Sequence, residues 1–127
     1  MKLLFLSLSI LFFSILHAQD WKMLSQQVDT MIYKGEYKKA IPFAEQSVFK
    51  IKSVLGENNE PYIKSQENLA ELYIIMDFYS KADSVLKYSL LLIKRMSGDD
   101  SAAYAPLLLK LGILYKRKAI MQTQKII

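Results

Sequence analysis

The sequence of 127 residues contains no cysteine. This absence excludes disulfide bonds and metal sites built on thiolates. The one histidine is His17, which lies in a segment that we predict below to be removed from the chain. A mature chain without Cys or His lacks the nucleophile–base pairs of cysteine and serine hydrolases and the usual zinc ligands. We therefore expect no enzyme activity, no metal and no cofactor.

Glycine and proline are also scarce, with four and three residues, which argues against an all-β fold built from many tight turns. Apolar residues make up 52% and charged residues 23% of the chain, the balance of a globular protein. The net charge of +5 is a mild excess, and the basic residues that follow Asp100 are expected to form a solvated helix face. We expect no nucleic-acid partner.

The N-terminus has the layout of a secretory signal peptide. Lys2 precedes an apolar run over residues 3–16, and the first acidic residue is Asp20. We predict a signal peptide at 1–18, with cleavage after Ala18 or, as second choice, after Gln19, and export to the periplasm or medium. The 14 residues of the run would span about 21 Å as a helix, less than the roughly 30 Å of bilayer hydrocarbon. An uncleaved membrane anchor is therefore the less favoured alternative.

The chain matches itself at an offset of 42 residues, as in Tyr37 and Tyr79 (79 − 37 = 42). The match has no gaps between 37–73 and 79–115, and it pairs Ala40 with Ala82, Ser47 with Ser89, Gly56 with Gly98, and Tyr73 with Tyr115. A fixed period of this length is the mark of a repeat architecture. We predict units at about 21–55, 61–96 and 102–127, the last incomplete, within one domain at 19–127.

Each unit is predicted to contain two helices. Leu69, Leu72, Tyr73 and Met76 follow the i, i+3, i+4, i+7 spacing of an apolar helix face. The predicted helices cover 21–34, 37–55, 61–76, 79–96 and 102–118, and residues 119–127 would begin a sixth. Small residues at equivalent positions, Ala70 and Gly112, are expected to let neighbouring helix backbones approach closely. One hairpin cannot cover its own apolar face, so the hairpins must stack.

The stretch 69–82, LAELYIIMDFYSKA, contains neither Gly nor Pro. Its position 77 is equivalent to Gly35 (77 − 35 = 42), so we predict that Asp77 forms the turn between two helices. Ala119 is equivalent to Asp77 and is a poor turn former. There we expect either one continuous helix from Ala102 to the end or a frayed tail.

These residues resemble a known repeat. Asn68-Leu69-Ala70-x-Leu72-Tyr73, then Tyr79-x-x-Ala82 and Gly98-Asp99, resemble the tetratricopeptide repeat (TPR) of the kinesin-light-chain type. Ser47 and Ser89 depart from the family's second-helix alanine. The resemblance implies an all-α fold in which antiparallel helix pairs stack as a right-handed superhelix, or α-solenoid, with about five helices after the signal peptide. The short signal ending in Ala-Gln resembles exported proteins of the Bacteroidetes type, and the incomplete last unit suggests a fragment of a longer protein.

The same resemblance implies a function as a non-catalytic protein-interaction scaffold. In this family the first helix of each pair lines a concave surface that binds an extended peptide or a protein, and Asn68 matches the family's Asn. The residues that the resemblance assigns to this surface are Gln26, Asp29, Tyr33, Lys64, Asn68, Glu71, Lys110 and Ile113. The alternative for these residues is that they are simply solvated polar positions.

Two other functions remain open from the sequence. The chain could be the N-terminal repeat region of a larger exported enzyme or sensor, such as a caspase-like peptidase or a histidine kinase. It could also self-associate through its C-terminal end, where no polar capping helix covers the last apolar face.

Overall fold

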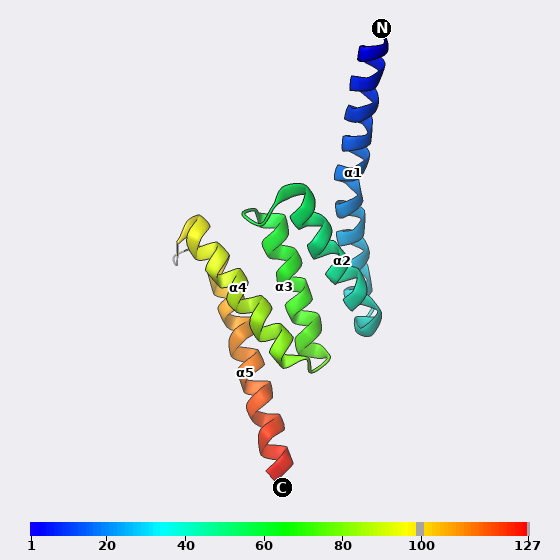
Figure 1. Ribbon diagram of the computed structural model, residues 1–127. Coiled ribbons are helices and arrows are strands. Elements are labelled where there is room, and N and C mark those ends of the chain that lie inside the picture. Colours follow the sequence, from blue (N-terminus) through cyan, green and yellow to red (C-terminus); the bar gives the residue numbers. More distant parts are fainter. Residues whose placement is uncertain (99–100, 127) are drawn as a thin grey trace.

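The computed structural model describes residues 1–98 and 101–126, without the side chains of 14–19. Every regular element in this part is an α-helix, which confirms the prediction of an all-α fold (Figure 1). The helices are α1 (Lys2–Tyr33), α2 (Tyr37–Leu55), α3 (Glu60–Ile75), α4 (Tyr79–Ser97) and α5 (Tyr104–Ile126).

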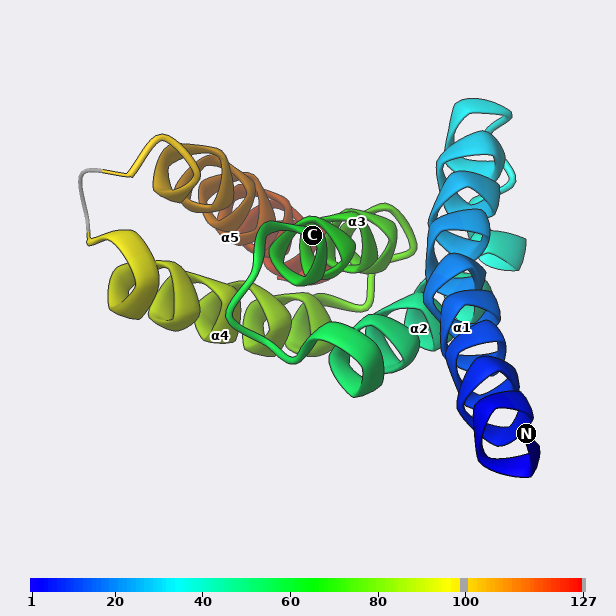
Figure 2. The same cartoon turned by 90° about the horizontal axis from the view of Figure 1, so that it is seen from above.

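Each helix packs against the next one in the chain, and α3 also contacts α5. Consecutive helices run in opposite directions, as Figure 1 shows, because short turns of a few residues join them. Seen from above, in Figure 2, α3, α4 and α5 form one group, and α2 connects this group to α1. The first half of α1 and the last turns of α5 project from the packed body (Figure 1).

The first helix differs from the prediction. We expected a helix at 21–34 after a separate leader, but α1 runs without a break over 32 residues. The reason is that residues 2–33 contain no Gly or Pro, so nothing in the sequence stops the helix at residue 18. The apolar side chains of its first half stand in solvent, since Leu3 is 87% and Phe12 is 70% exposed. The predicted start of the first helix at Trp21 is therefore wrong, whereas its predicted end at Lys34 lies one residue from the observed end at Tyr33.

The last helix resolves the open question at Ala119. α5 passes through this residue and continues to Ile126. Of the two expected outcomes the continuous helix is the one observed, although it begins at Tyr104 rather than Ala102. Alanine has the highest helix propensity of all residues, so a turn at this position has nothing to favour it. The separate sixth helix that we predicted from residue 119 is therefore wrong.

The predicted turn at Asp77 is confirmed. Gly35 and Asp77 both adopt positive φ, +74° and +64°, and Asp77 is the one non-glycine residue described with this conformation. In both turns the third residue past the helix donates its N–H back across the helix end, from Glu36 to Met31 O at 2.9 Å and from Phe78 to Tyr73 O at 2.7 Å. This is the Schellman motif, which ends a helix and reverses the chain.

The Asp77 turn has additional side-chain support. The Tyr79 hydroxyl donates a hydrogen bond to the Asp77 carboxylate at 2.7 Å. The same bond raises the pKa of the Tyr79 phenol, because it stabilises the protonated form. The rings of Tyr73 and Phe78 meet edge to face, with 6.3 Å between their centroids. These contacts offset part of the roughly 1–2 kcal/mol that a left-handed conformation costs an L-amino acid.

The core repeats with the period of the sequence. Ala40 and Ala82 are both fully buried, and so are the pairs Ile51 and Ile93, Leu72 and Leu114, and Ser47 and Ser89. Members of each pair are 42 residues apart (82 − 40 = 42), so at these four pairs equivalent positions have equivalent burial. The match of burial to sequence period follows because each helix meets its neighbours with the same face.

Gly112 departs from this rule. Its equivalent Ala70 is fully buried, as expected for a position where helix backbones approach closely. A Cβ added at Gly112, in contrast, would meet no atom within 4 Å. The prediction of close packing is therefore correct for Ala70 and wrong for Gly112. The reason is that α3 has a neighbouring helix on each side, α2 and α4. α5, in contrast, packs on α4 with a smaller contact to α3, and none of the described helices covers the face that carries Gly112.

The two glycines Gly35 and Gly112 offer a matched test, because an added Cβ meets no atom at either site. Gly35→Ala forces alanine into positive φ and should lower the free energy of unfolding by about 1 kcal/mol. Gly112→Ala acts inside a helix and should raise it by about 0.5–1 kcal/mol. Urea titrations followed by circular dichroism measure both changes. Shifts of the same sign in the two variants would show that the assigned backbone conformations are wrong.

Candidate functional site

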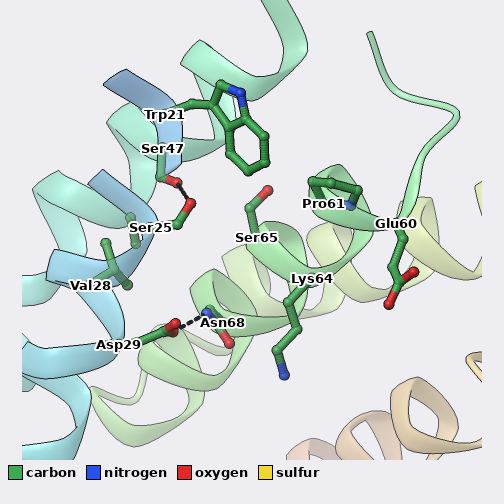
Figure 3. Close-up of a pocket in the computed structure, with 11 residues that line it drawn as sticks. Trp21, Ser25, Val28, Asp29, Ser47, Glu60, Pro61, Lys64, Ser65 and Asn68 are labelled. Carbon is green, nitrogen blue, oxygen red and sulfur yellow. Dashed lines mark hydrogen bonds between the residues drawn. The ribbon is translucent and has the colours of Figure 1, made fainter. Parts of the chain in front are cut away.

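A pocket of about 290 Å³ lies where α1, α2 and α3 meet (Figure 3). Three of the predicted partner-binding residues, Asp29, Lys64 and Asn68, line it. The other lining residues are Trp21, Ser25, Val28, Ala44, Ser47, Glu60, Pro61 and Ser65. The pocket therefore combines an aromatic ring and aliphatic side chains with hydroxyl, amide and charged groups.

Asp29 and Asn68 are bonded to each other. The Asn68 amide nitrogen donates to the Asp29 carboxylate at 2.9 Å, which joins α1 to α3 at one side of the pocket (Figure 3). This bond uses one of the two amide hydrogens of Asn68, and the amide oxygen is an acceptor. The side chain is therefore held in one orientation and has the groups needed to meet the N–H and C=O of a peptide backbone.

A second polar contact joins α3 to α5. The Lys110 ammonium lies 3.0 Å from a carboxylate oxygen of Glu71 and 3.6 Å from one of Glu67. Glu71 is equivalent to Asp29 (71 − 29 = 42), and Lys110 is equivalent to Asn68 (110 − 68 = 42). The same pair of positions thus makes a polar contact twice, once between α1 and α3 and once between α3 and α5.

The predicted residues other than Asp29, Lys64 and Asn68 do not line this pocket. Gln26 and Ile113 are exposed and do not line it. Tyr33 is 92% exposed at the last position of α1. Lys64 lines the pocket, and its ammonium lies 3.8 Å from Glu67. The contacts of the predicted residues therefore form two groups, the pair of Asp29 with Asn68 and the ion pairs of Lys64, Glu71 and Lys110, with Gln26, Tyr33 and Ile113 outside both.

Sequence reasoning missed the serines of this pocket. The hydroxyls of Ser25 and Ser47 are 3.1 Å apart and hydrogen-bonded, and Ser47 is almost fully buried (Figure 3). The Ser65 hydroxyl donates to the Tyr62 carbonyl at 2.7 Å. The departure of Ser47 from the family's alanine was a visible signal for a polar pocket. The identity of its partner was not visible, because Ser25 lies 22 residues away on another helix.

A second, more open hollow of about 980 Å³ lies between α1 and α2. It contains none of the predicted residues and has two exposed apolar side chains, Met23 and Phe49, at its surface. The rest of its lining is Asp20, Leu24, Gln27, Pro42, Glu45, Gln46 and Lys50. It combines these apolar side chains with polar ones, of which Glu45 accepts a hydrogen bond from the Tyr73 hydroxyl and Asp20 lies 3.9 Å from the Lys50 ammonium.

Among the described residues there is no group of His, Asp or Glu side chains that could hold a metal ion. A search of the same residues finds no helix with the length and apolar character needed to cross a membrane. Comparison with known proteins finds no protein-family model that matches the chain and no curated protein with a significant match.

The two polar contacts should respond differently to salt. Double-mutant cycles on Asp29→Ala with Asn68→Ala, and on Glu71→Gln with Lys110→Met, should each give a coupling of about 0.5–1 kcal/mol in dilute buffer. In 1 M NaCl the Glu71–Lys110 coupling should fall strongly, because it joins two full charges. The Asp29–Asn68 coupling should change little, since asparagine is neutral. Equal salt dependence in urea titrations of both cycles would contradict the assigned contacts.

Proposed function

We propose that this chain is an exported TPR-like scaffold that binds a peptide or protein partner on the face shared by α1, α3 and α5. In this proposal the helices stack in pairs as a right-handed superhelix, and the three odd-numbered helices line its concave side. The observation that carries the proposal is the polar contact that recurs at equivalent positions, at Asp29–Asn68 beside the pocket and again at Glu71–Lys110.

Several features support the repeat. The sequence period of 42 coincides with two Schellman turns, at Gly35 and Asp77 (77 − 35 = 42). It also coincides with pairs of buried residues, Ala40 with Ala82 and Leu72 with Leu114. The sequence, the backbone conformation and the burial share this period, which favours stacked equivalent hairpins over an unrelated helical bundle.

The chemistry of the pocket favours an extended peptide as ligand. A peptide in extended conformation presents unpaired N–H and C=O groups along its length, and an amide side chain such as that of Asn68 can pair with both. Trp21 at the edge of the pocket provides an apolar surface for one side chain. The bond to Asp29 restrains the Asn68 side chain before binding, which lowers the entropy cost of association.

Export is supported by the first half of α1. Its apolar side chains are exposed, so this segment contributes little to the packed body, and its removal would leave the core residues in place. Val28 is the first fully buried residue of the chain described. A cut after Ala18 would fall ten residues before it (28 − 18 = 10) and would leave the contacts between α1 and α2 that follow.

Binding at this face can be tested with peptides selected from a random library against the full chain. Asn68→Ala should weaken the selected peptides about tenfold, because the backbone contact is lost. Asn58→Ala is the matched control, since Asn58 is exposed in the loop between α2 and α3. Fluorescence anisotropy measures both affinities. Equal affinities for the two variants would place the binding site elsewhere.

Export can be tested in a Gram-negative host. The full chain should lose residues 1–18, and N-terminal sequencing of the periplasmic product should begin at Gln19 or Asp20. Leu8→Arg, which puts a charge in the apolar run, should stop processing, whereas Ser80→Arg on exposed α4 surface should not. A full-length product that stays in the cytoplasm in all three cases would contradict the proposal.

A further inference from the structure

One face of α5 is exposed along its whole length and carries a regular pattern. Its members are Leu108, Gly112, Tyr115, Ala119, Gln122 and Ile126, which follow one another at steps of 4, 3, 4, 3 and 4 residues. This is the 3.5-residue period with which one α-helix packs along another. We refer to these six residues as the α5 seam. It faces away from the candidate site, because Lys110 lies about 160° around the helix from Gly112.

On α3, the residues equivalent to the α5 seam are buried by neighbouring helices. Gln66 and Tyr73, equivalent to Leu108 and Tyr115, are each 6% exposed, because α3 is covered on both sides. Leu108 and Tyr115 are 46% and 45% exposed. Between them Gly112 has no atom within 4 Å of an added Cβ, so a second helix backbone has room to approach there.

At the N-terminal end of the array, two exposed positions of α1 are polar. On α3 the positions Leu69 and Leu72 are buried, and their equivalents on α1 are Gln27 and Thr30, both exposed (69 − 27 = 42). At these two positions the N-terminal end has polar residues, although Met23 on the same helix is an exposed apolar side chain. The α5 seam keeps Leu, Tyr and Ile at its exposed positions, which is the composition of an interface rather than of a solvated end.

The charges beside the seam identify the chemistry of the partner. Beside the seam, the Asp83 carboxylate of α4 accepts a hydrogen bond from the Tyr115 hydroxyl at 2.8 Å, and the Lys87 ammonium, 2.9 Å from it, balances its charge. At about 100° per residue, Lys116 of α5 lies on one flank of the seam and Lys118 and Lys125 lie on the other. All three lysines are exposed. A second copy of α5 would bring these lysines together with their own counterparts, which like-charge repulsion disfavours. Glutamate or aspartate on both flanks of an incoming helix would pair with them.

We propose that the α5 seam binds an amphipathic helix that has apolar residues at 3.5-residue spacing and acidic residues on both flanks. The partner helix lies along α5 from Leu108 to Ile126, with a small side chain at the point where it crosses Gly112. Because the seam and the face at Asn68 lie on different sides of the molecule, this binding is independent of the function proposed above.

The test uses the full chain and a fluorescent 21-residue peptide with Leu and Ala at the seam positions of three heptads and Glu at the flanking positions. The Glu peptide should bind saturably, and 0.5 M NaCl should weaken it. A peptide with Lys in place of Glu should bind at least about tenfold more weakly. Leu108→Gln should reduce affinity for the Glu peptide about tenfold, because it removes an apolar contact.

Leu109→Gln is the matched control, since Leu109 is also exposed but lies about 100° away from Leu108 around the helix. It should leave the affinity unchanged. Equal binding of the Glu and Lys peptides, equal loss in the two variants, or no saturable binding would overturn the proposal. Light scattering without peptide shows whether the chain dimerises through the α5 seam. A dimer that Leu108→Gln dissociates would identify another α5 as the occupant and would also overturn it.

Discussion

The close approach of helices at alanine is the constraint on which the rest of this structure depends. Ala40, Ala70 and Ala82 are completely buried, each on a different helix. A larger side chain at any of them would separate two helix backbones and expose the leucines and isoleucines that surround them. No helix here can bury its apolar face alone, so each pair of neighbours depends on these contacts for its share of the hydrophobic stabilisation.

The turns make that approach possible. Two residues with positive φ, Gly35 and Asp77, reverse the chain within a few residues and bring the next helix back against the one before. The side chain at Asp77 costs conformational energy that glycine would avoid, and its bond to Tyr79 replaces some of it. At Ala119 neither device is present, and α5 continues straight into solvent.

Much of the fold was predictable from the sequence because the period of 42 residues lets a clear signal in one unit identify the equivalent position in the next. The turn at Asp77 has no breaker of its own and was found only through its equivalence to Gly35. The start of the first helix at Trp21 was wrong because cleavage sites and helix ends are different properties, and α1 has no residue that stops a helix. The packing at Gly112 was missed because burial depends on the neighbouring helix, and a repeat pattern does not say whether that neighbour exists.

The candidate site was predictable to a smaller extent. Asn68 and Lys110 were found through a resemblance in the first helix of each unit, and the structure joins them to Asp29 and Glu71. Ser25 and Trp21 were not found, because they contribute through packing between α1 and α2 that no short motif records. Tyr33 was assigned to the site by position alone, and it extends into solvent at the end of α1.

Because α1 is continuous, residues 2–18 and the packed part of the chain share one helix, and Asp20 lies near their junction. Asp20 now lies inside a long helix, where its carboxylate is 3.9 Å from the Lys50 ammonium on α2. Under the proposed cleavage the helix would begin at residue 19 or 20, and the same carboxylate would stand among the free N–H groups of a new helix end. A carboxylate in the first turn stabilises a helix through its dipole. Maturation would thus turn an interior aspartate into a terminal one and start the first helix of the mature domain at a residue already anchored to α2.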